Sequence, residues 1–167
     1  MTGAWGFIGN VLTDKGEEGG TAYLRRLSAQ NIAPIGASTR AILDGVIGGE
    51  HAMVLGVSAH NTEISRRAGA PVAFLPLSSA WAIMHVIGVT AGAPHPAAAR
   101  LLVDFALSTE GQEIFSNAGY LPSRPDVPPL SPAISPQLAG FKANVLAPEL
   151  IDRDIARWSD VFTTIFR

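Results

Sequence analysis

The chain alternates segments of helical periodicity with short apolar runs of strand length, and this alternation limits its fold more than any other feature. Helices are predicted at about 2–12, 17–30, 40–47, 60–68, 96–107, 109–118 and 148–166, and strands at 32–35, 51–57, 72–75 and 84–90. Strands that alternate with helices build an α/β domain whose sheet is mostly parallel and flanked by helices.

The composition favours a packed domain and excludes several classes of site. With 47% hydrophobic and 16% charged residues in 167, the chain has the make-up of one globular domain, or of one domain and part of another. Its net charge of −2 and its dispersed Lys and Arg residues give no support to a nucleic-acid partner. The absence of cysteine excludes a disulfide framework, cysteine-based zinc sites and a thiol nucleophile.

Residues 88–122 carry the most specific motifs of the chain. They read Gly88-Val89-Thr90, Gly92-Ala93-Pro94-His95-Pro96, an apolar helix ending at Ser108, Thr109-Glu110-Gly111-Gln112, and Gly119-Tyr120-Leu121-Pro122. This order resembles the late part of bacterial solute-binding proteins of ABC importers, in the ferric-ion and small-anion group of type II periplasmic binding proteins. Gly49-Glu50 and Gly69-Ala70-Pro71-Val72 extend the resemblance, which begins partway through such a protein.

The resemblance implies a fold, a function and a set of partners. The fold is that of a type II periplasmic binding protein, with residues 1–76 as its second α/β lobe and residues 77–167 as a crossover, a return strand and C-terminal helices. The chain is then a fragment of a non-catalytic carrier without a cofactor. This carrier holds a small polar or anionic solute in an interlobe cleft and delivers it to an ABC permease in the inner membrane. Residues after 84 would expose apolar surface, which favours self-association.

The implied location is the periplasm, although the N-terminus does not read as a leader. Residues 1–5 have neither the basic region nor the apolar core of a signal peptide. Either a leader and more residues have been removed, or the chain starts by design at an internal methionine, and we expect the second.

Two places are predicted to contact the solute through helix starts. The turn Ser38-Thr39-Arg40 opens a helix with free backbone N–H groups, two hydroxyls and a guanidinium, which together suit an anion. The structural alternative is that Ser38 only caps the helix. Thr2 and Gly3 resemble the Ser-Gly turn that opens the preceding helix of these carriers and faces the cleft.

Ser58, His60 and Asn61 form a third predicted contact region, after the run 51–57. In open α/β sheets, ligands bind beyond the carboxyl ends of the strands. Ala59 and His60 fall where ferric-binding relatives carry two tyrosines, and the only tyrosines here are Tyr23 and Tyr120. This departure argues against ferric chemistry, because a hard ferric ion prefers phenolate ligands. The alternative for His60 is a backbone hydrogen bond at a helix start.

Alternatives outside transport are a scaffold domain without solute and, less favoured, a serine hydrolase. Gly56-Val57-Ser58-Ala59-His60 lacks only the second glycine of a nucleophile turn. Its one acid before His95 is Glu63, which is badly placed to orient a distant imidazole. Ser78, Ser79 and Trp81 fall in the crossover and either line the cleft or, for Trp81, pack in the core. No metal site is predicted, since His95 has no ligand neighbour at metal spacing.

Overall fold

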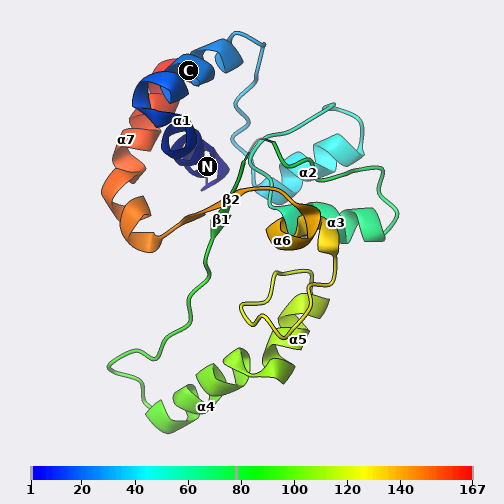
Figure 1. Ribbon diagram of the computed structural model, residues 1–167, viewed down its shortest axis with the longest axis vertical. Helices are drawn as coiled ribbons and strands as arrows, with labels where there is room; N and C mark the ends of the chain where they lie inside the picture. Colours follow the sequence, from blue (N-terminus) through cyan, green and yellow to red (C-terminus); the bar gives the residue numbers. More distant parts are fainter. Residues whose placement is uncertain (1, 78, 167) are drawn as a thin grey trace. The chain divides into compact units, whose positions relative to one another are not determined.

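The computed structural model describes residues 2–77 and 79–166 (Figure 1). The helices are α1 (Thr2–Ser28), α2 (Thr39–Ile47), α3 (Ala59–Arg67), α4 (Pro96–Leu107), α5 (Thr109–Asn117), α6 (Pro136–Ala139) and α7 (Pro148–Phe166). The strands are β1 (Ala80–Ile83) and β2 (Ala143–Leu146), and a 3-10 turn spans Pro132–Ile134.

These elements fall into two compact units. Unit 1 contains the residues up to Met84 and those from Phe141 onward, and unit 2 contains His85–Gly140. Their bounds differ from the lobes predicted at 1–76 and 77–167, whose assignment stays a prediction.

All the predicted helical segments form helices, and local sequence signals account for their ends. The first two join in α1, which bends at Gly16 with φ 72° and ψ 171°, a conformation that residues with a side chain avoid. The break therefore lies in the Asp14-Lys15-Gly16 turn where it was predicted. Ser38 precedes α2 and Ser108 precedes α5, and each hydroxyl accepts a hydrogen bond from the first turn of its helix.

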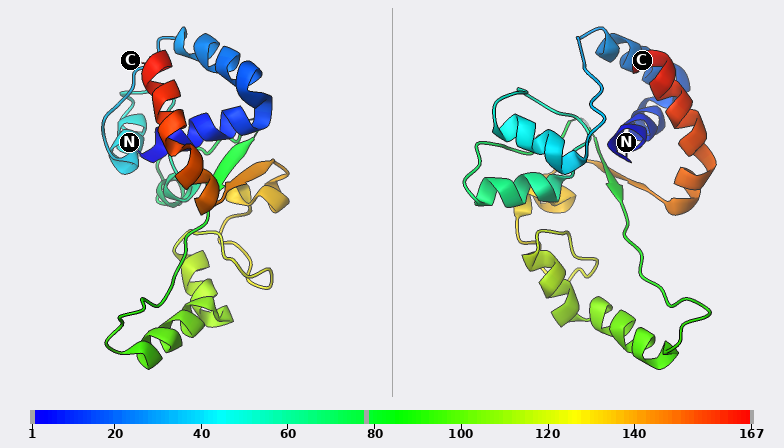
Figure 2. Two further views of the ribbon diagram at one scale, coloured as in Figure 1. Left: turned by 90° about the vertical axis from the view of Figure 1, so that its left-hand side faces the viewer. Right: turned by 180° about the vertical axis from the view of Figure 1, so that it is seen from behind.

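The core of unit 1 lies where α1 meets α7 and the two strands. Ile8, Leu24 and Leu146 are buried there with Trp158, whose ring stacks on Trp5 with centroids 6.4 Å apart. Figure 2 shows α7 running beside α1.

Small residues on α1 allow this close approach. A Cβ on Gly9 would lie 2.8 Å from the Trp158 ring, and one on Gly6 would lie 2.9 Å from the Trp81 ring. Trp81 also lies 6.3 Å from Trp5, so the predicted packing role of Trp81 is confirmed.

The described sheet has two parallel strands, with Ala80 opposite Ala143 and Ile83 opposite Leu146. The chain is therefore a mixed α/β protein that is mostly helical, and its strand pairing is parallel as predicted. The strands predicted at 32–35, 51–57, 72–75 and 84–90 are wrong, and β1 and β2 were not predicted.

The four segments do not form strands because no neighbouring strand among the described residues pairs with them. A strand must give its backbone N–H and C=O groups to a neighbouring strand, and the described chain brings none to these four segments. Several of their apolar side chains lie in solvent, with Met53 and Leu75 each 69% exposed and Val86 82% exposed. An apolar run alone is thus not enough to form a buried strand.

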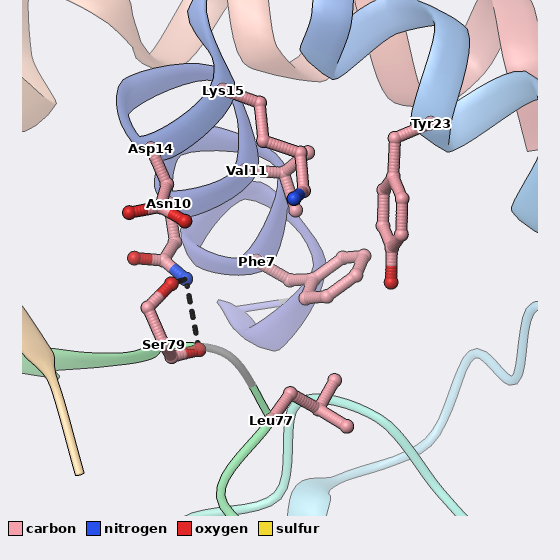
Figure 3. A pocket seen from close by; sticks show the side chains of 8 residues that line it. All are labelled: Phe7, Asn10, Val11, Asp14, Lys15, Tyr23, Leu77 and Ser79. Carbon is pink, nitrogen blue, oxygen red and sulfur yellow. Dashed lines mark hydrogen bonds between the residues drawn. The ribbon is translucent and has the colours of Figure 1, made fainter.

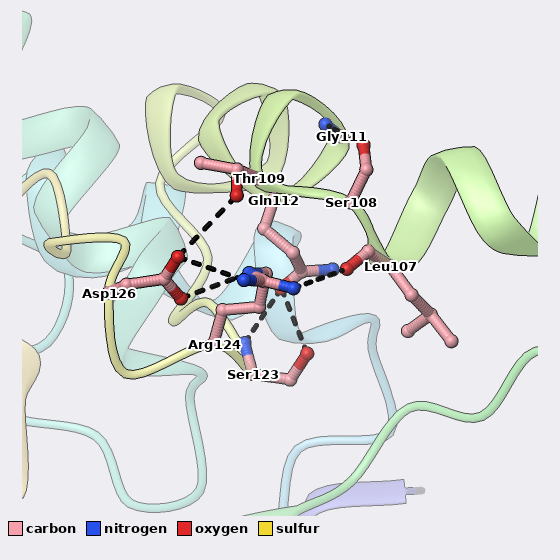
Figure 4. A network of polar contacts seen from close by, with 8 residues as sticks. All are labelled: Leu107, Ser108, Thr109, Gly111, Gln112, Ser123, Arg124 and Asp126. Carbon is pink, nitrogen blue, oxygen red and sulfur yellow. Dashed lines mark hydrogen bonds and ion pairs between the residues drawn. The ribbon is translucent and has the colours of Figure 1, made fainter.

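In unit 2, the α4–α5 corner (residues 105–112) is fixed by the motif that follows Leu107 (Figure 4). The Ser108 hydroxyl accepts a hydrogen bond from Gly111 N at 3.1 Å and donates one to Phe105 O at 2.7 Å. Gln112 is buried, and its Nε2 donates to Ala106 O at 2.7 Å. Its Oε1 accepts from the backbone N–H of Ser123 at 2.7 Å, which ties the corner to the proline-rich segment.

A second polar contact holds the same segment to the start of α5. Arg124 donates to both carboxylate oxygens of Asp126, at 3.0 and 2.9 Å, and Thr109 donates to Asp126 at 3.4 Å. The hydrogen bonds from Arg124 hold the pKa of Asp126 below its usual range. The Thr109-Glu110-Gly111-Gln112 motif thus has a structural explanation within unit 2.

Candidate functional site

The start of α2 carries the first group of predicted solute contacts, and part of this group is engaged within the chain. Ser38 caps the helix by accepting a hydrogen bond from Ala41 N at 3.2 Å. Arg40 pairs with Asp44 at 2.7 Å and donates to the Ser65 hydroxyl at 3.0 Å. Thr39 is half-buried. The structural role of Ser38 is confirmed, and the solute contacts of all three residues stay predictions.

The start of α3 carries the second group. Ser58 immediately precedes the helix in an extended conformation, and its side chain makes no capping hydrogen bond. Its carbonyl accepts hydrogen bonds from Asn61 N at 3.1 Å and Thr62 N at 3.3 Å. Ser58, His60 and Asn61 are all half-buried, so each remains reachable from solvent.

The hydrogen bond from Arg40 to Ser65 links α2 to α3, but it does not bring the two predicted groups of solute contacts together. Arg40 meets Ser65, which lies five residues after His60, or roughly 7 Å further along the helix axis. The Arg40 side chain therefore reaches the later part of α3, whereas His60 and Asn61 lie at the beginning of that helix.

The remaining predicted contacts are at the start of α1 and in the crossover segment. Thr2 and Gly3 begin α1, and the structure describes their backbone but not their side chains. Ser78 lies outside the described residues.

The described backbone around Ser58 differs from that of a hydrolase nucleophile. Among the described residues before Ser58, none forms a strand, so the tight strand-to-helix turn of a nucleophile serine is not formed. Glu63 is 3% exposed and accepts two hydrogen bonds from Arg66, both at 2.8 Å. These hydrogen bonds raise the pKa of Arg66.

A small polar pocket on α1, which the sequence interpretation missed, lies beside the start of β1 (Figure 3). Asn10 is 3% exposed, and its Nδ2 donates to the Ser79 hydroxyl at 3.2 Å while its Oδ1 accepts from Asn144 Nδ2 at 2.7 Å. The sequence feature that could have revealed this buried polar contact is Asn10 itself, the single amide residue in the apolar stretch Trp5–Leu12. The full lining is Phe7, Asn10, Val11, Asp14, Lys15, Tyr23, Leu77 and Ser79.

The charges of this α1 pocket are largely neutralised. Asp14 forms an ion pair with Lys142, and the hydrogen bond from Lys142 holds the pKa of Asp14 below its usual range. The Lys15 ammonium lies over the Tyr23 ring, 5.3 Å from its centroid, in a cation–π contact. With a volume of about 20 Å³, the pocket has room for one water molecule and not for a solute.

Two further findings limit the chemistry of the described part of the chain. Among residues 2–77 and 79–166, no three His, Asp or Glu side chains come together as metal ligands would. None of the helices in these ranges combines the length and apolar character needed to cross a membrane.

Comparisons with known proteins agree with the resemblance read from the motifs. A family profile described as "Bacterial extracellular solute-binding protein" matches residues 10–121. The chain is also 31% identical, over 155 residues, to a "Putative 2-aminoethylphosphonate-binding periplasmic protein" of Salmonella typhimurium and to one of the same name in Salmonella paratyphi A. These matches cover 89% of the chain but only 44% of each relative, so the chain spans less than half their length. No solved structure matches the chain significantly.

Proposed function

Because this chain belongs to the bacterial extracellular solute-binding proteins, we propose that it captures a small polar or anionic solute for an ABC importer. The observation that carries the proposal is the family match over residues 10–121. Proteins of this family bind solutes and do not catalyse reactions, so the chain is not an enzyme. Its family is extracellular or periplasmic, and the periplasm is the compartment that we propose.

The solute that we propose to test first is 2-aminoethylphosphonate, for which the relatives are named. It joins a phosphonate to an ammonium by a short apolar spacer. Recognition would require N–H, hydroxyl or guanidinium donors for the phosphonate and a carbonyl, carboxylate or amide oxygen for the ammonium.

The phosphonate is proposed to bind at the start of α2. In the first turn of this helix, the backbone N–H of Ala41 donates to the Ser38 hydroxyl, and the backbone N–H of Ile42 donates to the Ser38 carbonyl. The backbone N–H groups of Thr39 and Arg40 have no acceptor within the helix, and the helix dipole favours an anion there. Thr2, Gly3, Ser58, His60 and Asn61 are proposed as further contacts at other helix starts.

The remainder of the proposal concerns the longer carrier. Residues 1–76 are assigned to its second lobe and 77–167 to the crossover, return strand and C-terminal helices. The cleft between two lobes would close on the solute and present it to a permease in the inner membrane. Only part of such a cleft belongs to this chain, so we expect solute binding by the chain alone to be weak.

A thermal-shift titration tests this function. A solute at ten times its dissociation constant stabilises the folded state by about 1.4 kcal/mol, which raises the melting temperature by roughly 3–6 °C for a chain of this size. We expect such a shift with millimolar 2-aminoethylphosphonate and a smaller one with ethylamine. If no phosphonate, phosphate ester or sugar shifts the melting temperature, the scaffold alternative replaces the proposal.

A matched pair of variants tests the site. Ser38→Ala and Ser108→Ala each remove one helix cap, so both lower the starting melting temperature through a similar loss of about 1 kcal/mol. Only Ser38→Ala is expected to reduce the solute-induced shift. An equal solute-induced shift in both variants would place the solute elsewhere while leaving the function intact.

A further inference from the structure

A second, larger depression is lined by residues of α1 and α7 and includes none of the predicted solute contacts. Its polar lining consists of Thr21 and Arg25 from α1 and of Arg157, Asp160 and Thr164 from α7. We call it the α1–α7 groove. Its volume is about 210 Å³, ten times that of the α1 pocket.

The groove holds one cation and one anion that have no partner among the described residues. Within residues 2–77 and 79–166, neither the Arg25 guanidinium nor the Asp160 carboxylate makes an ion pair or a side-chain hydrogen bond. The Thr21 and Thr164 hydroxyls likewise have no hydrogen bond there, although Thr163 bonds to Ser159 O in the same helix. These four groups therefore remain available to a ligand.

The other charges that face this region are already neutralised. Arg157 donates to Glu17 at 2.5 Å, a contact that joins α7 to α1. Asp154 is paired with Arg153 at 2.8 Å and lies 3.8 Å from Arg157. The hydrogen bonds from Arg153 hold the pKa of Asp154 below its usual range, and its ion pairs engage it with Arg153 and Arg157.

This pattern of charge selects against ligands of one sign. A simple anion would meet Arg25 favourably but would also lie beside Asp160, and a simple cation would meet the two guanidinium groups. A ligand with both charges avoids both conflicts. Its anionic group can take the planar guanidinium of Arg25 in a bidentate contact, and its ammonium can reach Asp160. Val161 and Ile165 supply an apolar surface for the carbon spacer between them.

We infer that the α1–α7 groove is a binding site for small zwitterions, independent of the solute site at the start of α2. The groove is built on a rigid base, because α1 and α7 enclose the core of unit 1 around Trp158. Arg25 recognises the anionic group, and Asp160 recognises the ammonium. Arg157 remains held by Glu17 and adds a second positive charge beside the anion.

The test is a two-dimensional NMR titration of the chain with 3-aminopropanoate, which has six non-hydrogen atoms. Propanoate and propylamine serve as probes that carry only one of its charges. We expect saturable shifts of the Thr21 and Thr164 amides with 3-aminopropanoate at millimolar concentration, and affinities at least tenfold lower for the two single-charge probes. Equal affinity for propanoate, or no shift at these amides, would overturn the inference.

Matched variants separate the site from general charge effects and from the proposed function. Arg25→Ala and Asp160→Asn are each expected to weaken 3-aminopropanoate binding at least tenfold. Arg26→Ala removes the neighbouring exposed arginine, which lies outside the groove, and Ser38→Ala alters the start of α2; both should leave the affinity unchanged. Unchanged binding in Arg25→Ala would refute the inference, because Arg25 is its anion receptor.

Discussion

Replacing Gly111 with alanine tests the account of the α4–α5 corner with a change of one methyl group. A Cβ at this position would lie 2.1 Å from Phe105 O and 3.0 Å from the Cα and O of Ala106. All three are backbone atoms, so no side-chain rotation can relieve the overlap. The end of α4 must instead move away from α5.

The magnitude follows from two opposing effects. Alanine favours a helix over glycine by about 1 kcal/mol. Overpacking costs about 1–3 kcal/mol, and moving Ala106 also weakens its buried hydrogen bond from Gln112, for about 1–2 kcal/mol more. Because the overlap at Phe105 O is severe, we place the total cost in the upper half of the resulting range, at about 4 kcal/mol. The expected net loss in the stability of unit 2 is about 3 kcal/mol.

Gly19→Ala provides the matched control. The nearest atom to a Cβ at Gly19 is Lys15 Cβ at 3.8 Å, an ordinary contact on an exposed part of α1. Here only the helix preference acts, so the same substitution should stabilise unit 1 by about 0.5–1 kcal/mol. One chemical change thus has opposite predicted signs at two positions.

Two measurements report on the two units separately. Trp5, Trp81 and Trp158 all lie in unit 1, so tryptophan fluorescence follows the unfolding of that unit. Hydrogen exchange of residues 96–118 follows unit 2. We expect Gly111→Ala to speed exchange in α4 and α5 about 100-fold, the equivalent of about 3 kcal/mol. Exchange protection equal to or above that of the wild type would refute the reasoning.

Three further predictions concern the α1 pocket and the exposed helices. Since the pKa of Asp14 is lowered by Lys142, this carboxylate stabilises the fold above its unfolded-state pKa and loses that effect as the pH falls through its folded-state pKa. The stability of Asp14→Asn should therefore fall less steeply than that of the wild type below about pH 4, and superimposable profiles would contradict this. Asn10→Leu should lower the free energy of unfolding by about 2 kcal/mol in urea denaturation, because Asn144 and Ser79 lose a buried partner; the exposed Asn117→Leu is the control, and an unchanged Asn10→Leu midpoint would argue against the network. Leu101 and Leu102 on α4 are 71% and 61% exposed, so the chain should self-associate in light scattering and a Leu101→Lys, Leu102→Lys variant should do so less; a wild type that stays monomeric at millimolar concentration would disprove this.

The candidate sites were only partly accessible to sequence reasoning. Ser38 was identified as a capping residue because its hydroxyl acts within its own first turn. The Arg40–Ser65 contact and the Asn10–Ser79–Asn144 network were not foreseen, because they join residues 25, 69 and 134 positions apart. Likewise, the unpaired Arg25 and Asp160 have ordinary sequence surroundings, and only the packing of α7 on α1 places them in one groove.

The sequence by itself determined the helices, including the bend at Gly16 and the corner at Ser108, since capping and apolar spacing act over one or two turns. The sequence also determined the family, because the order of its motifs along the chain can be compared without knowing the fold. The strands were decided by tertiary structure: β1 and β2 are 60 residues apart, and each is a strand only because the other accepts its backbone hydrogen bonds. The apolar run 51–57 has stronger strand character than Ala143–Leu146, yet it finds no partner and stays without regular structure.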